Sequence, residues 1–123
     1  MKGVLQSSIE RGKRVRFIVK GNSMYPFIKA GEKVEIERVG KIRIGDVVLL
    51  KRKNEFLLHR VLFVFRNFVI TKGDRSPFID HPSQIKNVIG KVRKEEGFLK
   101  IFRTIISILS LPLSYLKFVL RKK

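Results

Sequence analysis

The chain has 123 residues, with 28 Lys and Arg against 10 Asp and Glu, and a formal net charge of +18 at pH 7. This length suits one domain with a small appendage, and the 44% of hydrophobic residues excludes a wholly disordered basic tail. The absence of Cys excludes a disulfide framework and thiolate metal sites, and two His alone argue against a transition-metal site built by the protein.

The excess of positive charge predicts attraction to polyanions, either nucleic acid or anionic lipid headgroups. A well-solvated basic surface explains the same composition. Charge alone therefore leaves these interpretations open.

The first predicted element is a short helix within residues 2–12, where Val4, Leu5 and Ile9 fall on one side. Six short segments follow, rich in β-branched and aromatic residues and separated by Gly, Asn, Asp or Pro turns. They span residues 14–20, 33–39, 46–50, 56–65, 68–71 and 87–92. Without a strong helical period, this series predicts a small, mostly antiparallel β fold, closed in a barrel-like manner.

A change in charge marks the end of the predicted β domain. All ten acidic residues lie at or before Glu96, and the six basic residues after it have no acidic neighbours. We therefore expect a compact domain in residues 1–96 and a separate basic, hydrophobic helix in residues 97–123.

The C-terminal segment has two competing membrane interpretations. The thirteen residues between Arg103 and Lys117 carry no charge, so residues 101–120 approach the minimum length of a span. A narrow polar stripe instead favours a helix in the plane of the headgroups, and it consists of Arg103, Ser107, Ser110, Ser114, Lys117 and Arg121. Docking on the domain is the third interpretation, and Pro112 would kink the helix in each case. The first 20 residues show no apolar core of a secretory signal peptide.

The candidate catalytic residues are a serine, two histidines and two aspartates. Ser23 follows Gly-Asn directly after a predicted strand, where a sharp turn exposes a hydroxyl. His59 lies in a strongly apolar strand, whereas His81 stands in a loop beside Pro82. Asp74 and Asp80 flank the next turn, where hydrogen bonding within the turn is the simplest role for both. Taken singly, each of these residues has an ordinary structural explanation.

The order of these motifs is more specific than any one of them. Gly-Asn-Ser-Met-Tyr-Pro at residues 21–26 precedes Leu-His-Arg-Val at residues 58–61, and Thr-Lys-Gly-Asp follows at residues 71–74. Over residues 14–92 the chain resembles the signal peptidase I family of membrane-associated serine proteases. It is most similar to the archaeal and endoplasmic-reticulum branch, in which the general base is a His and not a Lys.

The resemblance implies a role for each matching residue. Ser23 corresponds to the nucleophile, His59 to the general base, and Asp80 to the orienting carboxylate, with Asp74 as the second candidate. The chemistry agrees, since a serine hydroxyl needs a base and an Asp on the far ring nitrogen fixes the imidazole tautomer. No cofactor or metal is implied. Cleavage after small residues is implied, and Met24, Tyr25 and Pro26 are candidates for shaping the substrate groove, with core packing as the alternative.

Two departures from the family pattern concern the oxyanion hole and the membrane anchor. Many relatives have a Ser two residues before the nucleophile, where this chain has Gly21, and the lost hydroxyl corresponds to about 3 kcal/mol of transition-state stabilisation. The usual anchor is an N-terminal transmembrane helix, but here the hydrophobic segment is C-terminal. The resemblance thus predicts association with a cell membrane, while the sequence leaves the side of the membrane open.

The expected partners are a peptide or preprotein substrate and a lipid surface, with a membrane protein on the C-terminal helix as a further option. No nucleic-acid partner is implied by the resemblance. Two other functions compete with it. A self-cleaving protease of the phage-repressor type shares the β core but uses Ser and Lys. A non-enzymatic basic β domain would bind nucleic acid or anionic lipid, with exposed Phe side chains as stacking partners.

Overall fold

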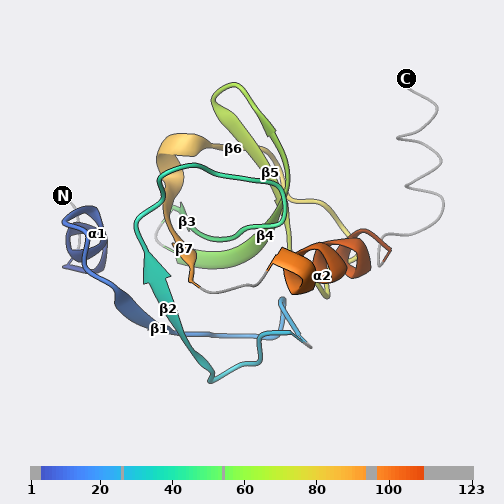
Figure 1. The fold of residues 1–123 in the computed structure, drawn as a ribbon, viewed down its shortest axis with the longest axis horizontal. Helices are drawn as coiled ribbons and strands as arrows, with labels where there is room; N and C mark the ends of the chain where they lie inside the picture. Colours follow the sequence, from blue (N-terminus) through green and yellow to red (C-terminus); the bar gives the residue numbers. More distant parts are fainter. Residues whose placement is uncertain (1–3, 26, 54, 94–96, 110–123) are drawn as a thin grey trace.

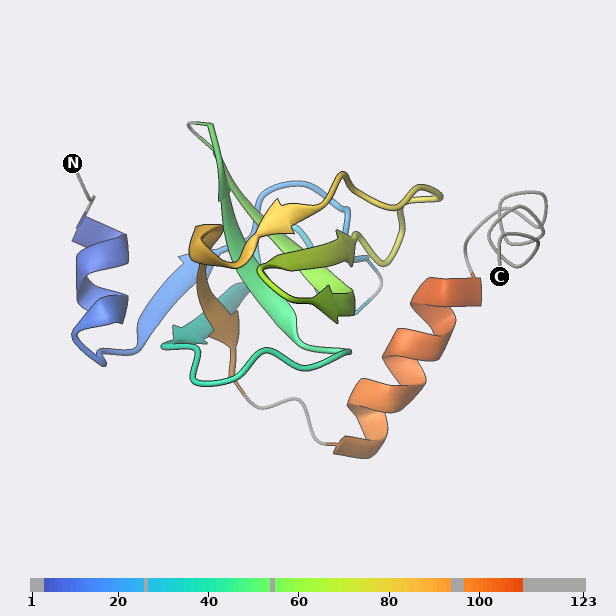
Figure 2. The same cartoon turned by 90° about the horizontal axis from the view of Figure 1, so that it is seen from above.

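The computed structural model describes residues 4–25, 27–53, 55–93 and 97–109, and it is mostly β (Figure 1). Its elements in chain order are α1 (Val4–Glu10), β1 (Val15–Ile18), β2 (Lys33–Glu37), β3 (Val47–Arg52), β4 (Glu55–Phe65), β5 (Phe68–Lys72), β6 (Ser83–Gln84), the 3₁₀ turn η1 (Ile85–Asn87), β7 (Val88–Val92) and α2 (Gly97–Leu109). The two α-helices lie at opposite ends of the molecule in both views (Figures 1 and 2).

The strands form one open, antiparallel, seven-stranded sheet in the order β1-β2-β7-β3-β4-β5-β6. Strand β4 is its longest member, with 11 residues. Its first half pairs with β3, and from Arg60 onward it pairs with β5, with a register shift between Val61 and Phe63. This shift allows one strand to contribute to two differently oriented parts of the sheet.

Hydrophobic residues are buried on both faces of the sheet. Alternation along β3 places Val47 and Leu49 in one core cluster and Val48 and Leu50 in another. The larger cluster also contains Ile9 of α1, which closes one end of the domain, and Ile36 of β2. A strand covered on both faces is expected to be almost continuously apolar, as β3 is.

The six predicted strands and the N-terminal helix are confirmed, with boundaries that differ by a few residues. The sequence did not reveal β6 or η1, because two- and three-residue elements have no measurable hydrophobic period. The observed sheet is open within the described residues, since neither β1 nor β6 pairs along its outer edge.

Helix α2 docks on the β domain through its polar side. Thr104 and Ser107 are buried, and the Arg103 guanidinium lies 5.2 Å from the centre of the Phe27 ring. The side chains of Ile105, Ile106, Ile108 and Leu109 are 36–67% exposed. The docked interpretation therefore holds for the described part of the segment, but with the apolar side facing outward. The rest of the predicted stripe and Pro112 lie outside the described residues.

None of the helices in the described parts of the chain combines the length and apolar character needed to cross a membrane.

Candidate active site

Strand alternation at the centre of β4 and β5 separates two groups of polar side chains. His59 pairs with Val48 and Arg60 pairs with both Val47 and Lys72, so the two neighbours on β4 face opposite sides of the sheet. On β5, Lys72 shares the Arg60 face, and Thr71 and the following Gly73 fall on the His59 face by the same period of two.

Asp80 reaches His59 from the loop that follows β5. Its Oδ2 is hydrogen-bonded to Nδ1 of His59 and accepts a second hydrogen bond of 2.8 Å from the Thr71 hydroxyl. The Asp80 backbone N–H donates to the Thr71 carbonyl over 2.9 Å, which returns the loop to the strand. His59 is 8% exposed. One ring nitrogen is thus fixed by a carboxylate, and the imidazole has a defined orientation.

The environment of Asp80 favours its charged form. Burial acts to raise its pKa, but the hydrogen bond and charge of His59 act against burial, as do the Thr71 hydroxyl and the positive charge of Arg52. The net result is a pKa below the ordinary value of an aspartate. An ionised Asp80 at neutral pH is the form that accepts a hydrogen bond from Nδ1–H and stabilises an imidazolium.

Ser23 lies in the turn after β1 and is packed against Gly73. A methyl group added to Gly73 would lie 2.8 Å from the Ser23 carbonyl oxygen, 3.0 Å from Ser23 Cβ and 3.3 Å from His59 Nε2. The backbone N–H of Arg75 also donates to the Ser23 carbonyl over 2.8 Å. Gly73 therefore brings the two segments together because it has no side chain.

This shared contact places Ser23 close to Nε2, the ring nitrogen of His59 that does not face Asp80. Since the added methyl group would contact both, Ser23 Cβ and His59 Nε2 are separated by at most the sum of those two distances. Among the interactions of the described residues, none joins the Ser23 hydroxyl directly to Nε2. Such hydrogen bonds are often loose in free enzymes and tighten on binding of substrate.

Asp74, the other candidate carboxylate, belongs to the opposite face. It forms a bidentate ion pair with Arg60, in which Nε donates to Oδ1 over 2.8 Å and Nη2 donates to Oδ2 over 2.9 Å. Both side chains are completely inaccessible to solvent. Arg60 also donates to the Gly45 carbonyl over 2.9 Å. Of the two aspartates, the structure therefore places Asp80 on His59 and Asp74 on Arg60.

Lys72 connects this buried ion pair to α2. Its ammonium group donates to the carbonyls of Gly73 and Asp74 at 2.7 and 3.3 Å, and to the Ser107 hydroxyl at 3.3 Å. Burial lowers the pKa of Lys72, opposed by the charges of Asp74 and Asp80 and assisted by that of Arg60. Lys72 thereby holds the loop beside Ser23 against the docked helix.

The three predicted substrate-groove residues lie in different environments. Met24 is 1% exposed, belongs to the main core cluster, and its sulfur accepts a 3.4 Å contact from the Asp74 backbone N–H. Tyr25 is 44% exposed, and the Arg75 guanidinium lies 5.6 Å from the centre of its ring. Pro26 lies outside the described residues.

His81 is exposed, and its carbonyl accepts a hydrogen bond from Arg52. It is not part of the His59 cluster.

Sequence reasoning missed the supporting residues Thr71, Gly73, Arg60 and Lys72. All four stand within the quoted motifs, yet their pairing depends on which face each one occupies. The available signal was the period of two along each strand. It places Thr71 and Gly73 on the face of His59, and Lys72 on the face of Arg60. No cluster of three or more potential metal ligands occurs in the part of the chain that the structure describes.

A scan against models of known protein families gives no match to this chain, and a search of curated proteins gives none either.

Proposed function

We propose that this chain is a serine endopeptidase of the signal-peptidase type, which cleaves signal or leader peptides of precursor proteins at a membrane surface. The observation that carries this proposal is the placement of Asp80 on one nitrogen of His59 while the other nitrogen shares the Gly73 contact with Ser23. Those are the three groups, in the required order, of a Ser-His-Asp hydrolase. A barrel-like catalytic core of that family is part of the same proposal.

The proposed reaction needs only side chains and water. His59 Nε2 removes the proton of the Ser23 hydroxyl as its oxygen attacks the scissile carbonyl carbon. The resulting imidazolium, stabilised by Asp80, donates this proton to the departing amine as the peptide C–N bond breaks. Water then attacks the acyl-enzyme, again with His59 as base, and releases the carboxylic acid and the free serine.

The developing oxyanion requires hydrogen-bond donors near Ser23. We assign the Ser23 backbone N–H to this role, because a turn that begins with Gly21 at φ +77° orients the peptide groups around the nucleophile. Gly21 supplies no hydroxyl, so this hole has one side-chain donor fewer than in many members of the family.

The orientation of α2 supports work at a membrane surface. A helix that buries Thr104 and Ser107 and exposes isoleucine and leucine side chains is the reverse of a helix in water. Phe78, in the loop that carries Asp80, is also 64% exposed. Apolar side chains next to a strongly basic chain fit the interface of an anionic bilayer. We propose that this side of the domain faces lipid.

The proposed substrate is an extended peptide with small residues, such as Ala, at the first and third positions before the scissile bond. Tyr25 is accessible for direct contact with it, while the buried Met24 would shape the cleft from within the core. Extended peptides bind to sheet edges through backbone hydrogen bonds.

The test compares Ser23→Ala with the unchanged protein on a precursor that carries Ala at both positions, in vesicles containing anionic lipid. Cleavage by Ser23→Ala should fall by a factor of about 10⁴ or more, because the nucleophile is lost. Product is measured by mass spectrometry, which also identifies the bond cleaved.

Ser8→Ala serves as the matched control, since it removes the same hydroxyl from α1, which lies away from the cleft. It should cleave at the wild-type rate, and all three proteins should unfold at the same temperature. Equal cleavage by Ser23→Ala and the wild type, or no cleavage by the wild type, would contradict the proposed activity.

A further inference from the structure

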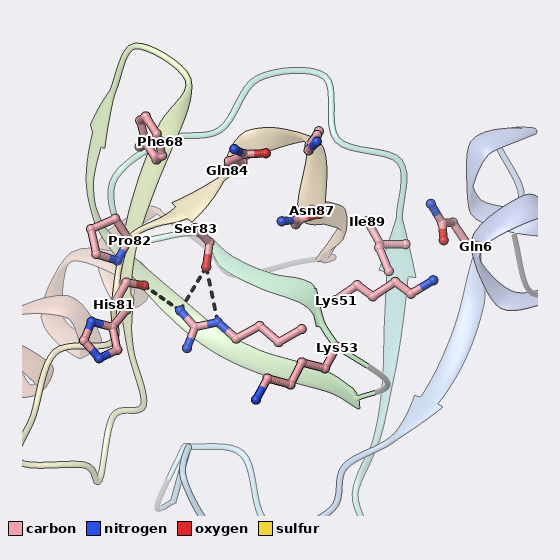
Figure 3. Close-up of a pocket in the computed structure, with 12 residues that line it drawn as sticks. Gln6, Lys51, Lys53, Phe68, His81, Pro82, Ser83, Gln84, Asn87 and Ile89 are labelled. Atoms are coloured by element: carbon pink, nitrogen blue, oxygen red, sulfur yellow. Dashed lines mark hydrogen bonds between the residues drawn. The ribbon is translucent and has the colours of Figure 1, made fainter. Parts of the chain in front are cut away.

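A basic groove has none of Ser23, His59 and Asp80 in its lining, although its Arg52 is close enough for its charge to act on Asp80. It is a cavity of about 740 Å³, between α1, the β3–β4 hairpin, β6 and η1 (Figure 3). Four of its lining residues are cationic, namely Lys51, Arg52, Lys53 and Lys86. No acidic side chain lines it among the described residues. This size falls within the range of small-molecule sites.

One cation of the groove is held in place before any ligand arrives. The Arg52 guanidinium donates to the Ser83 hydroxyl over 2.9 and 3.3 Å and to the His81 carbonyl over 2.5 Å, as the dashed lines in Figure 3 show. Ser83 is buried. A fixed guanidinium loses little conformational freedom on binding an anion. Its Nε and Nη2 donors are engaged by Ser83 and His81, which leaves Nη1 and the positive charge to attract phosphate oxygens.

The other walls offer contacts for a polar scaffold. Gln6, Gln84 and Asn87 contribute amide groups, which donate and accept hydrogen bonds, and Phe68 contributes a ring that is 45% exposed. Figure 3 shows these side chains arranged around the same hollow as Lys51 and Ser83. A ligand with several negative charges on a hydroxyl-rich or ring scaffold fits this combination better than an apolar or cationic ligand.

We propose that this groove binds a phosphate-bearing ligand with more than one negative charge. Four cationic residues line this groove with no acidic residue among its lining, so a multiply charged anion gains from the positive potential when it binds. A phosphate concentrates charge more densely than a carboxylate does. The headgroup of an anionic phospholipid and a soluble phosphate compound share this chemistry, and the site does not depend on the proposed protease activity.

The primary test measures binding of tripolyphosphate to the full chain by calorimetry, at constant ionic strength. Lys51→Gln combined with Lys86→Gln should weaken binding by about tenfold or more, because each lost ammonium removes a charge-assisted hydrogen bond. The variant with Lys51→Gln and Lys86→Gln is called the groove variant. Arg52 is left unchanged because it also anchors the loop beside Asp80.

Lys29→Gln combined with Lys41→Gln is the matched control, because it removes the same charge from exposed positions outside the groove. It should weaken binding by less than a factor of about two if long-range attraction is screened. Equal weakening by the two pairs would overturn the proposal, since binding would then reflect net charge alone.

Amide chemical shifts of the wild-type protein give a readout that needs no variant. Tripolyphosphate should shift the signals of Gln84, Lys86 and Asn87 and leave those around Ser23 unchanged. Shifts spread evenly over the basic surface would overturn the proposal, even if the groove variant failed to fold.

Vesicles distinguish the two sources of phosphate. If phosphatidylglycerol vesicles bind the wild type but not the groove variant, and tripolyphosphate competes with the vesicles for the wild type, the ligand is a headgroup. If vesicle binding is unchanged in the groove variant while tripolyphosphate binding is lost, the ligand is soluble. Groove-dependent binding of a single-stranded oligonucleotide without binding of tripolyphosphate would contradict the proposal and favour a nucleic-acid site.

Discussion

The two faces of the β4–β5 pair carry the same kinds of side chain in opposite environments. On one face, Asp80 contacts His59 close to Ser23, and the two side chains keep a small exposure of 15% and 10%. On the other face, Asp74 and Arg60 form an ion pair with no solvent access. The two aspartates are six residues apart in the chain, and strand alternation alone sends their partners to different sides.

This difference shows how local environment divides structural from chemical roles. A fully buried, two-pronged ion pair fixes the position of a loop and has no access to a substrate. A carboxylate on an imidazole that keeps slight solvent exposure orients a group that exchanges protons. The comparison therefore predicts that equal substitutions on the two faces will have unequal effects on activity and on stability.

Asp80→Asn gives the largest expected effect on activity. Replacing the charged oxygen with an amide favours the wrong imidazole tautomer, so kcat/KM for the proposed precursor should fall by about 10⁴-fold. The free energy of unfolding should change by only about 1 kcal/mol, as for one hydrogen bond. Cleavage assays and urea unfolding of the same preparation measure both, and activity within tenfold of wild type would remove Asp80 from the mechanism.

Asp74→Asn gives the largest expected effect on stability. It leaves Arg60 as a buried charge without its counterion, at a cost of about 3–5 kcal/mol in unfolding free energy. The urea midpoint measures this change. Adding Arg60→Met should recover part of the loss, because the stranded charge is then removed. A cost for Asp74→Asn smaller than that of Asp80→Asn would reverse the assignment of the two faces.

Gly73→Ala tests the close contact between Gly73, which follows β5, and Ser23. The new methyl group would lie 2.8 Å from the Ser23 carbonyl oxygen, so backbone must move. We expect a loss of about 1–3 kcal/mol in stability and about 100-fold in cleavage. Gly40→Ala is the matched control, because nothing lies within 4 Å of the methyl group there. Wild-type cleavage by Gly73→Ala would show that the contact does not position the nucleophile.

The smallest expected effect is a change in the acid dependence of stability. Because the pKa of Asp80 is lowered in the folded state, its ionised form stabilises the fold above the pKa of the unfolded chain. This contribution disappears as pH falls through the folded-state pKa. The difference in unfolding free energy between wild type and Asp80→Asn should therefore shrink from about pH 5 downward. A constant difference over this range would contradict the assigned environment of Asp80.

The alternation of polar and apolar residues, and the apolar runs, predicted most of the strands correctly. The segment around Lys33–Glu37 alternates cleanly, and the apolar run at Val47–Leu50 is buried on both faces of the sheet, so both appear as strands from sequence. The C-terminal helix was also expected, but its orientation was not. The sequence shows a polar stripe and an apolar remainder, and only the contacts of Thr104 and Ser107 show which side is covered.

The sequence identified the main residues of the candidate site, but it did not identify most of the contacts between them. Ser23, His59 and Asp80 were selected by resemblance, while Asp74 stayed an alternative because both aspartates follow the same strand. Thr71 and Gly73 were overlooked as partners because a hydroxyl and a glycine are common in turns. Their meaning depends on the register that places Thr71 and Gly73 on the His59 face.

By itself, the sequence determined the strand-rich class of the domain, its large positive charge and the types of side chain available for chemistry, since these follow from local pattern and composition. The tertiary structure alone decided which aspartate meets His59, which side of α2 faces outward and where four cations surround one cavity. Those arrangements arise from contacts between residues 14 to 50 positions apart. Local periodicity assigns each residue to a face of its own strand, but it does not say which distant segment pairs with that strand.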